Sequence, residues 1–95
     1  MEVAKVIVEQ LGPMAFMMMG ATNKLAGERD LSFKVGKNAK GVTHVKIELD
    51  PSDTYNVTFF KVRGLKIDKV DEVTMVFVDG LKKTIEKGTG LYLSL

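Results

Sequence analysis

The sequence predicts an α+β fold in which an antiparallel meander of about four to five strands packs against an N-terminal and a C-terminal helix. Three observations support this fold class. Apolar residues recur at helical spacing in the segments 3–11 and 75–85. Between these segments, short stretches alternate apolar and polar residues, as half-buried strands do. The turns between the stretches are short, and short connections favour antiparallel neighbours.

Residues 3–11 are predicted to form the first helix because apolar side chains recur there every three or four positions. These side chains are Val3, Val6, Ile7 and Leu11. The Gly12–Pro13 pair ends the helix, since proline disfavours the helical conformation of the residue before it. The number of valines leaves a strand as the alternative for this segment.

Residues 14–20, MAFMMMG, hold four of the six methionines and are predicted to form a strand. Alternate residues of a strand point to opposite faces, so both faces of this strand would be apolar and buried. The terminal helices or a second subunit would cover the second face. Core filling by methionine is the favoured interpretation. An exposed docking surface and a soft-metal site built on thioethers are the alternatives.

Four further strands are predicted from alternation, at residues 31–35, 42–49, 55–62 and 65–73. The third of these also has two apolar faces, because Phe60 and Val62 alternate with residues such as Phe59. The segments GKNAKG (36–41) and DPSD (50–53) and the residue Gly64 supply the turns between the strands.

Near the C-terminus the spacing of the apolar residues changes to that of a helix, and Phe77, Leu81 and Ile85 form one stripe. Lysines follow toward the end of this predicted helix, where the helix dipole favours cations. Gly88 is predicted to be the left-handed residue that ends the helix. The tail 89–95 alternates leucines with Tyr92 and Ser94 and is expected to pack against the domain.

Length and composition limit the classes of function. The 95 residues suffice for a single domain, residues 1–95. The absence of cysteine excludes a disulfide framework, a thiol nucleophile and thiolate zinc ligands, and it suits the cytoplasmic location that we expect. No segment approaches the ~20 apolar residues of a membrane span. Glu2 and Glu9 also argue against a signal peptide, so we expect no membrane association.

No residue pattern indicates catalysis, and we expect a protein that is not an enzyme and has no cofactor or metal. His44 has no second histidine and no carboxylate at catalytic spacing. Asp50 and Asp53 flank a turn, but no EF-hand spacing follows them. The GKNAKG segment differs from the GxxxxGK[ST] phosphate-binding loop, and no helix follows it.

A basic face is the clearest candidate site. The formal net charge is +2, but residues 1–46 carry +3 and residues 47–95 carry −1. If the lysines converge on the sheet, they suit a nucleic-acid backbone, and an exposed Phe60 would stack on a base. The candidate residues are Lys34, Lys37, Lys40, His44, Lys46, Phe60, Lys61, Arg63 and Lys66, with Lys69 nearby. A solvated lysine-rich surface is the alternative, and acidic residues at 68, 71 and 72 dilute the charge.

Three stretches of the chain resemble a family of small proteins met in bacteriophage and plasmid-borne genes. The family pattern is Q-L-G…M-x-G-A, then V-x-I-x-L-x-x-x-D-T-Y-x-V-x-F, then T-G-L-Y. The matching positions are Gln10, Leu11, Gly12, Met19, Gly20, Ala21, Val45, Ile47, Leu49, Asp53, Thr54, Tyr55, Val57, Phe59, Thr89, Gly90, Leu91 and Tyr92. Pro13 departs from the glycine that usually follows Gly12. The resemblance covers most of the chain and implies a mobile genetic element and a bacterial cytoplasm, without implying an activity.

The leading hypothesis is therefore a small binding protein that contacts nucleic acid through the lysine-bearing strands. The second hypothesis is a phage-type inhibitor of a host defence system, which binds a host protein. Its apolar interface would be formed by Met17, Met19, Phe60 and Val62. A homodimer would use the same apolar residues. A structural or assembly accessory protein is the third hypothesis.

Overall fold

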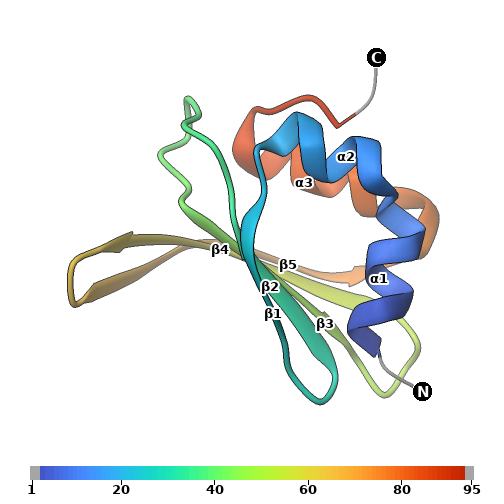
Figure 1. Cartoon of the computed structure of the whole chain (residues 1–95). Helices are drawn as coiled ribbons and strands as arrows, with labels where there is room; N and C mark the ends of the chain where they lie inside the picture. The colour runs from blue at the N-terminus through green and yellow to red at the C-terminus, as the bar shows by residue number, and fades with distance from the viewer. Residues whose placement is uncertain (1–2, 94–95) are drawn as a thin grey trace.

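The computed structural model describes residues 3–93, which form three α-helices and one five-stranded sheet (Figure 1). The helices are α1 (Val3–Leu11), α2 (Pro13–Met19) and α3 (Leu81–Thr89), and a 3-10 turn (Val78–Gly80) precedes α3. The strands are β1 (Thr22–Ala26), β2 (Asp30–Lys34), β3 (His44–Leu49), β4 (Tyr55–Arg63) and β5 (Lys66–Val76). The predicted α+β fold class is confirmed.

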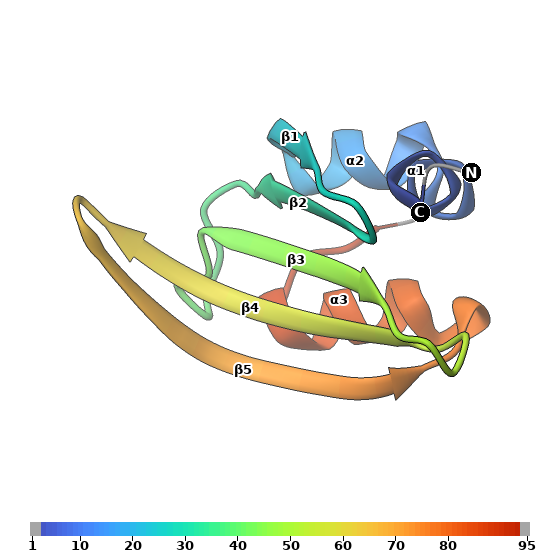
Figure 2. The ribbon, with the colours of Figure 1, turned by 90° about the horizontal axis from the view of Figure 1, so that it is seen from below.

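The five strands are antiparallel and lie side by side in chain order, so the sheet is a meander. Figure 2 shows that the sheet curves around the helices, which all lie on its concave side. Apolar side chains of that side, including Val45, Ile47, Val57 and Phe59 at 0% exposure, form the core with Ile7 and Ile85 of the helices. We call the concave side the covered face and the convex side the open face.

The prediction of a strand at residues 14–20 is wrong, because these residues belong largely to helix α2. Gly12, with a φ of 82°, makes the sharp turn from α1. Pro13 then occupies the first turn of α2, where its missing N–H group is not needed. The segment is apolar on all sides in sequence, so periodicity alone could not distinguish a buried strand from a helix.

Helix α2 has one buried side. Ala15, Phe16 and Met19 pack into the core, whereas Met17 is 73% exposed. The ring of Phe16 meets Phe33 of β2 edge-on, with centroids 5.3 Å apart. Methionine therefore does fill the core, as expected, but from a helix and through Met19 rather than through a central strand.

Strand β1 was not predicted, because all five of its side chains are exposed and leave no alternation to detect. It pairs with β2 across a bulge between Thr22 and Leu25. Asn23 in this bulge has a φ of 52°, a left-handed conformation that asparagine tolerates better than most residues.

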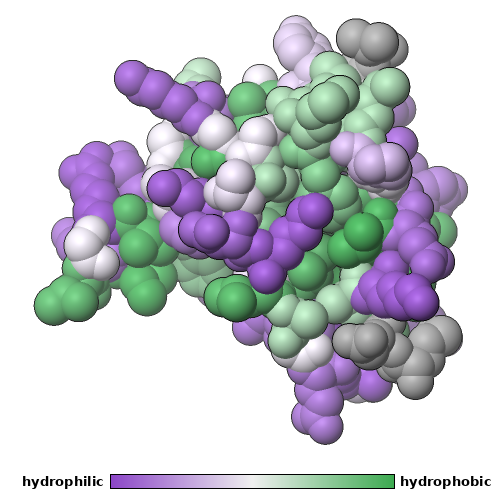
Figure 3. Space-filling model, in the orientation of Figure 1, coloured by the Kyte–Doolittle hydropathy of each residue, from purple (hydrophilic) through white to green (hydrophobic). Residues whose placement is uncertain are grey.

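The remaining strands lie close to their predicted positions. Leu31 and Phe33 are buried and Lys34 is exposed, as alternation indicated. Gly64, with a φ of 58°, begins the two-residue turn of the β4–β5 hairpin. The hairpin projects beyond the rest of the sheet (Figures 1 and 2), and Figure 3 shows hydrophilic and hydrophobic side chains close together on it. Strand β5 reaches Val76, past its predicted end at residue 73.

The C-terminal helix differs from its prediction at both ends. It begins at Leu81, so Phe77 lies before it and is 64% exposed instead of joining the buried stripe. It ends at Thr89 and is followed by the left-handed Gly90, which has a φ of 78°, so Gly88 lies inside the helix. The tail packs against the core through Leu93, which is 1% exposed. Ser94 and Leu95 of the predicted tail lie outside the described residues.

Several residues on which the resemblance rests make side-chain hydrogen bonds within the fold. The Thr89 hydroxyl donates to the Ile85 carbonyl at 2.7 Å and accepts from the Leu91 amide at 3.1 Å, which closes the end of α3. The Tyr55 hydroxyl donates to Gln10 Oε1 at 2.6 Å and joins α1 to β4. Burial raises the pKa of Tyr55 above its usual 10.0. These residues thus have structural roles in the fold.

The predicted turn at residues 50–53 is an Asx-type turn. The Ser52 amide donates to Asp50 Oδ2 at 3.0 Å, and the Ser52 hydroxyl donates to the same atom at 2.8 Å. These bonds, with a third from Asn56 and the charge of Arg29, hold the pKa of Asp50 below its usual 3.8.

The stability contributed by Asp50 should depend on pH. A carboxylate with a lowered folded-state pKa stabilises the fold above its unfolded pKa, near 3.8, and that stability is lost as the pH falls through the folded-state value. We expect the wild type to be more stable than Asp50→Ala near neutral pH and the difference to shrink in acid. Urea unfolding at several pH values measures this difference. Asp50→Asn, which keeps an oxygen acceptor but does not titrate, should show no such shrinkage relative to Asp50→Ala.

Candidate nucleic-acid interface

The open face of the sheet brings two aromatic rings and two lysines into one row. Lys34 lies opposite His44, His44 opposite Phe60, and Phe60 opposite Lys69. Directly opposed residues of antiparallel strands share a face and lie about 4.5–5.5 Å apart at Cβ. The row therefore crosses β2, β3, β4 and β5 with its rings in the middle and a lysine at each end.

A shallow hollow of about 320 Å³ lies beside this row. Its lining is Ser32, His44, Val45, Lys46, Phe60, Val62 and Ile67. Most of the lining surface is apolar. Both faces of β4 were expected to be covered, but Phe60 and Val62 face this hollow and remain partly exposed. No element within residues 3–93 packs over them.

The His44 ring is fixed by its neighbour Thr43. Thr43 Oγ1 lies 2.8 Å from His44 Nδ1, accepts from the Val62 amide at 2.8 Å and donates to the Phe60 carbonyl at 3.3 Å. Thr43 thus ties β3 to β4 at the position where the two rings adjoin. It orients His44 through Nδ1 and leaves Nε2 free of any hydrogen bond to the described residues.

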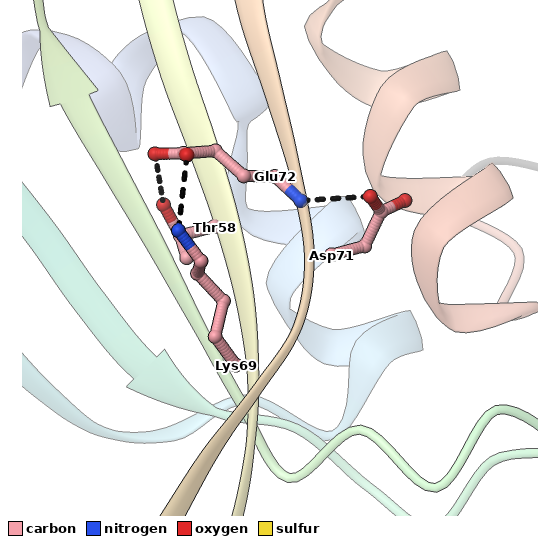
Figure 4. A network of polar contacts seen from close by, with 4 residues as sticks. All are labelled: Thr58, Lys69, Asp71 and Glu72. Carbon is pink, nitrogen blue, oxygen red and sulfur yellow. Dashed lines mark hydrogen bonds and ion pairs between the residues drawn. The ribbon is translucent and has the colours of Figure 1, made fainter.

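Ion pairs reduce the positive charge of the open face. Lys69 Nζ lies 3.2 Å from Glu72 Oε1, and the Thr58 hydroxyl donates to the other oxygen of Glu72 at 3.4 Å (Figure 4). Lys46 Nζ lies 4.0 Å from Asp30 Oδ2. Among residues 3–93, Lys34 has no such ion pair. The face is therefore apolar at its centre and close to charge-balanced at its rim, where the lysines share the face with Asp30, Glu48 and Glu72.

The other predicted cations do not join this row. Lys61 lies opposite Asp68, and Arg63 lies opposite Lys66, on the covered side of the projecting hairpin. The period of two in β4 already separated Lys61 and Arg63 from Phe60, although the sequence analysis grouped them. Lys37 and Lys40 lie in the loop between β2 and β3. The predicted basic face is thus divided between two sides of the sheet.

The predicted apolar interface is also divided. Met17 is exposed on α2, on the covered side of the sheet, whereas Phe60 and Val62 lie on the open face. Met19 is 1% exposed and belongs to the core. A single contact surface made from all four residues is therefore excluded by the fold.

The structure adds residues that sequence reasoning missed. Thr43 orients His44, and Ile67 forms one wall of the hollow. Lys69, which the sequence placed near the basic face, lies at one end of the row of opposed residues. The alternation of 65–73 placed Ile67 and Lys69 on the same strand face. Only the β4–β5 register shows that this face adjoins Phe60 and Val62.

Comparisons with protein-family models, with curated proteins and with solved structures give no match to this chain. Within residues 3–93, no helix combines the length and the apolar character required to cross a membrane. The same stretch contains no group of three His, Asp or Glu side chains arranged to hold a metal ion.

Proposed function

We propose that the protein is a non-enzymatic module that binds single-stranded nucleic acid on the open face of its sheet. The observation that carries this proposal is the row Lys34–His44–Phe60–Lys69. Aromatic platforms flanked by cations bind single strands without requiring a base sequence, because every base has a face that stacks. The resemblance to phage and plasmid-borne proteins supports a role in the bacterial cytoplasm.

Each part of the open face has a role in this proposal. Phe60 stacks on a base that enters the apolar hollow, and the adjoining His44 ring extends the platform. Lys34 and the partly neutralised Lys46 and Lys69 contact phosphates at the rim. With so few free cations, the salt dependence is expected to be modest, with a slope of log affinity against log salt near −2 for about three phosphates.

The decisive experiment is a titration of a fluorescent single-stranded oligonucleotide with the wild type, Phe60→Ala and Phe77→Ala. Loss of a stacked base costs about 1–3 kcal/mol, so Phe60→Ala should weaken binding by roughly 5-fold to 150-fold. Phe77 is exposed at 64% but lies outside the row, so Phe77→Ala is the matched control and should bind like the wild type. Equal binding by the two variants would contradict stacking on Phe60.

The rim lysines are tested through salt dependence. Lys34→Ala should reduce the magnitude of the salt slope by about 0.7, which corresponds to one lost phosphate contact on a single strand. Lys5→Ala removes the same charge from helix α1, away from the row, and should leave the slope unchanged. No binding of the wild type at low salt would exclude the proposed function altogether.

A further inference from the structure

The tip of the β4–β5 hairpin stands clear of the other strands. The ladder between β3 and β4 starts at the pair His44–Phe60, so residues of β4 beyond Phe60 have ladder partners only in β5. We call this free part of the hairpin, residues 61–68, the arm. Its tip residue Leu65 is 105% exposed. With a rise of about 3.3 Å per residue, the arm carries Leu65 roughly 15 Å past Phe60.

The covered side of the arm is cationic. Arg63 lies opposite Lys66, and Lys61 lies opposite Asp68. Asp68 is the only acid of the arm, and its Oδ2 lies 3.9 Å from Lys66 Nζ. Within the described part of the chain, Lys61 and Arg63 form no ion pair. Three cations and one acid give the arm a net charge of +2.

The loop between β2 and β3, residues 35–43, extends this cationic surface. It carries Lys37 and Lys40 and no acid. Its Gly41 adjoins the arm, because a Cβ atom built on Gly41 would lie 3.4 Å from Lys61 Nζ. Figure 1 shows that the loop and the arm project from the same end of the sheet, and Figure 3 shows hydrophilic side chains on both. We call the charged residues of the loop and the arm together the arm–loop surface.

The backbone of the loop is held in place by Asn38. Its Nδ2 atom donates to the carbonyls of Gly36 and Val42 at 2.8 and 2.7 Å, and its Oδ1 atom accepts from the Val42 amide at 3.1 Å. The Gly36 amide donates to the Met19 carbonyl at 2.8 Å, which ties the loop to helix α2. The two lysines on either side of Asn38 are therefore presented from a fixed backbone.

Neighbouring acids do not neutralise the arm–loop surface. Asp71, the next acid along the covered side of β5, lines a hollow together with Lys87 of α3, so these two charges balance. Glu86 of the same helix accepts a hydrogen bond from the Leu93 amide at 3.0 Å. With these three residues added, the surface has six cations and three acids and keeps a net charge of +3. This excess of cations selects a polyanion as the partner.

From these features we infer that the arm–loop surface binds double-stranded DNA, with the arm in the major groove. The two strands of the arm lie about 4.8 Å apart. With its side chains, such a ribbon fits the B-DNA major groove, which is about 12 Å wide, but not the minor groove of about 6 Å. The major groove of duplex RNA is too narrow for side chains to enter. The width of the arm therefore favours DNA over RNA.

The parts of the surface have distinct roles on the duplex. One sugar–phosphate backbone lies between the loop and the arm, where Lys40, Lys61 and Arg63 contact its phosphates. Leu65 reaches the base edges, on which the thymine methyl is the apolar group. This site is separate from the proposed single-strand interface and does not rest on it, because it uses neither Phe60 nor the hollow of the open face.

The first test is a titration of a short fluorescent DNA duplex with the whole protein at several salt concentrations. We expect a slope of log affinity against log salt of about −3.6, which corresponds to four phosphate contacts on a duplex. An RNA duplex of the same sequence and polyglutamate of similar charge should each bind at least about fivefold more weakly. No binding of duplex DNA at low salt would overturn the inference. Equal affinity for the RNA duplex or for polyglutamate would also overturn it.

Single-lysine and single-arginine variants locate the contact. Arg63→Ala on the arm and Lys40→Ala on the loop should each reduce the magnitude of the salt slope by about 0.9. Both side chains are exposed, so both variants are expected to fold. Lys82→Ala, the matched control, removes the same charge from the first turn of α3, outside the arm–loop surface, and should leave the slope unchanged. Equal slopes for all three variants would place the DNA elsewhere.

The position of the tip is tested with a modified duplex. Leu65→Ala should weaken binding to a thymine-rich duplex by about threefold or more, because apolar contact with the thymine methyl groups is lost. Uracil lacks this methyl group, so the variant and the wild type should bind a duplex with uracil in place of thymine equally well. An equal loss on both duplexes would contradict the placement of Leu65 in the major groove.

Phe60→Ala separates this site from the proposed single-strand interface. It should weaken the binding of single strands and leave duplex affinity unchanged, whereas Arg63→Ala should weaken duplex binding. Loss of duplex binding in Phe60→Ala together with normal duplex binding in Arg63→Ala would assign the duplex to the open face, and the inference of a separate arm–loop site would be wrong.

Discussion

The Gly88→Ala variant is expected to be less stable than the wild type by about 1–3 kcal/mol, or more, because it overpacks the core. The sign is the opposite of the usual effect, since alanine in a helix interior is favoured over glycine by about 1 kcal/mol. A Cβ atom on Gly88 would overlap the ring of Phe59, which is 0% exposed in the core beneath α3. The ring is enclosed and can move aside only by displacing other core residues.

Gly80→Ala is the matched control for this prediction. Gly80 precedes the same helix with a φ of −98°, and nothing lies within 4 Å of a Cβ atom built on it. We expect Gly80→Ala to stay within about 1 kcal/mol of the wild type. Urea unfolding of both variants gives the two free energies. Equal stabilities would show that α3 does not approach β4 as closely as described.

A double-mutant cycle identifies the clash. If the cost of Gly88→Ala comes from the Phe59 ring, it should shrink when that ring is replaced by the smaller leucine side chain. Contacting residues show coupling energies of about 0.5–3 kcal/mol. Additive effects of Gly88→Ala and Phe59→Leu would place the origin of the instability elsewhere in the core.

The sequence predicted the middle of the sheet well for a physical reason. Each of β2 and β3 has one face in the core and one in solvent, so residues such as Phe33 and Lys34 alternate clearly. Strand β1 is exposed at all five positions and gives no such signal. Gly88 was interpreted as a helix end because its packing partner, Phe59, is distant in sequence and only the fold brings the two together.

The candidate site was predictable only in part. Alternation placed His44 and Lys46 outward on the same strand, and the structure puts both beside the hollow with Phe60. The row itself depends on the register between four strands, which no single strand reveals. The ion pairs that neutralise Lys46 and Lys69 depend on the same pairing. The charge of the face was therefore overestimated from composition.

Met19→Ala should destabilise the protein by about 2–5 kcal/mol, whereas Met17→Ala should stay within about 0.5 kcal/mol of the wild type. The two changes remove the same atoms two positions apart. In a strand, residues 17 and 19 would share one face and the two costs would be similar. In helix α2 they point in different directions, and the exposed fractions are 73% for Met17 and 1% for Met19.

Urea unfolding of the two methionine variants measures this difference directly. Alanine is a better helix former than methionine, so a loss of helix propensity cannot explain a cost at either position. A large loss of stability at Met19 alone supports the helical conformation of the methionine-rich segment and its packing against Phe33. Similar costs at both positions would instead support the buried strand that the sequence first suggested, and the packing described for α2 on the covered face would be wrong.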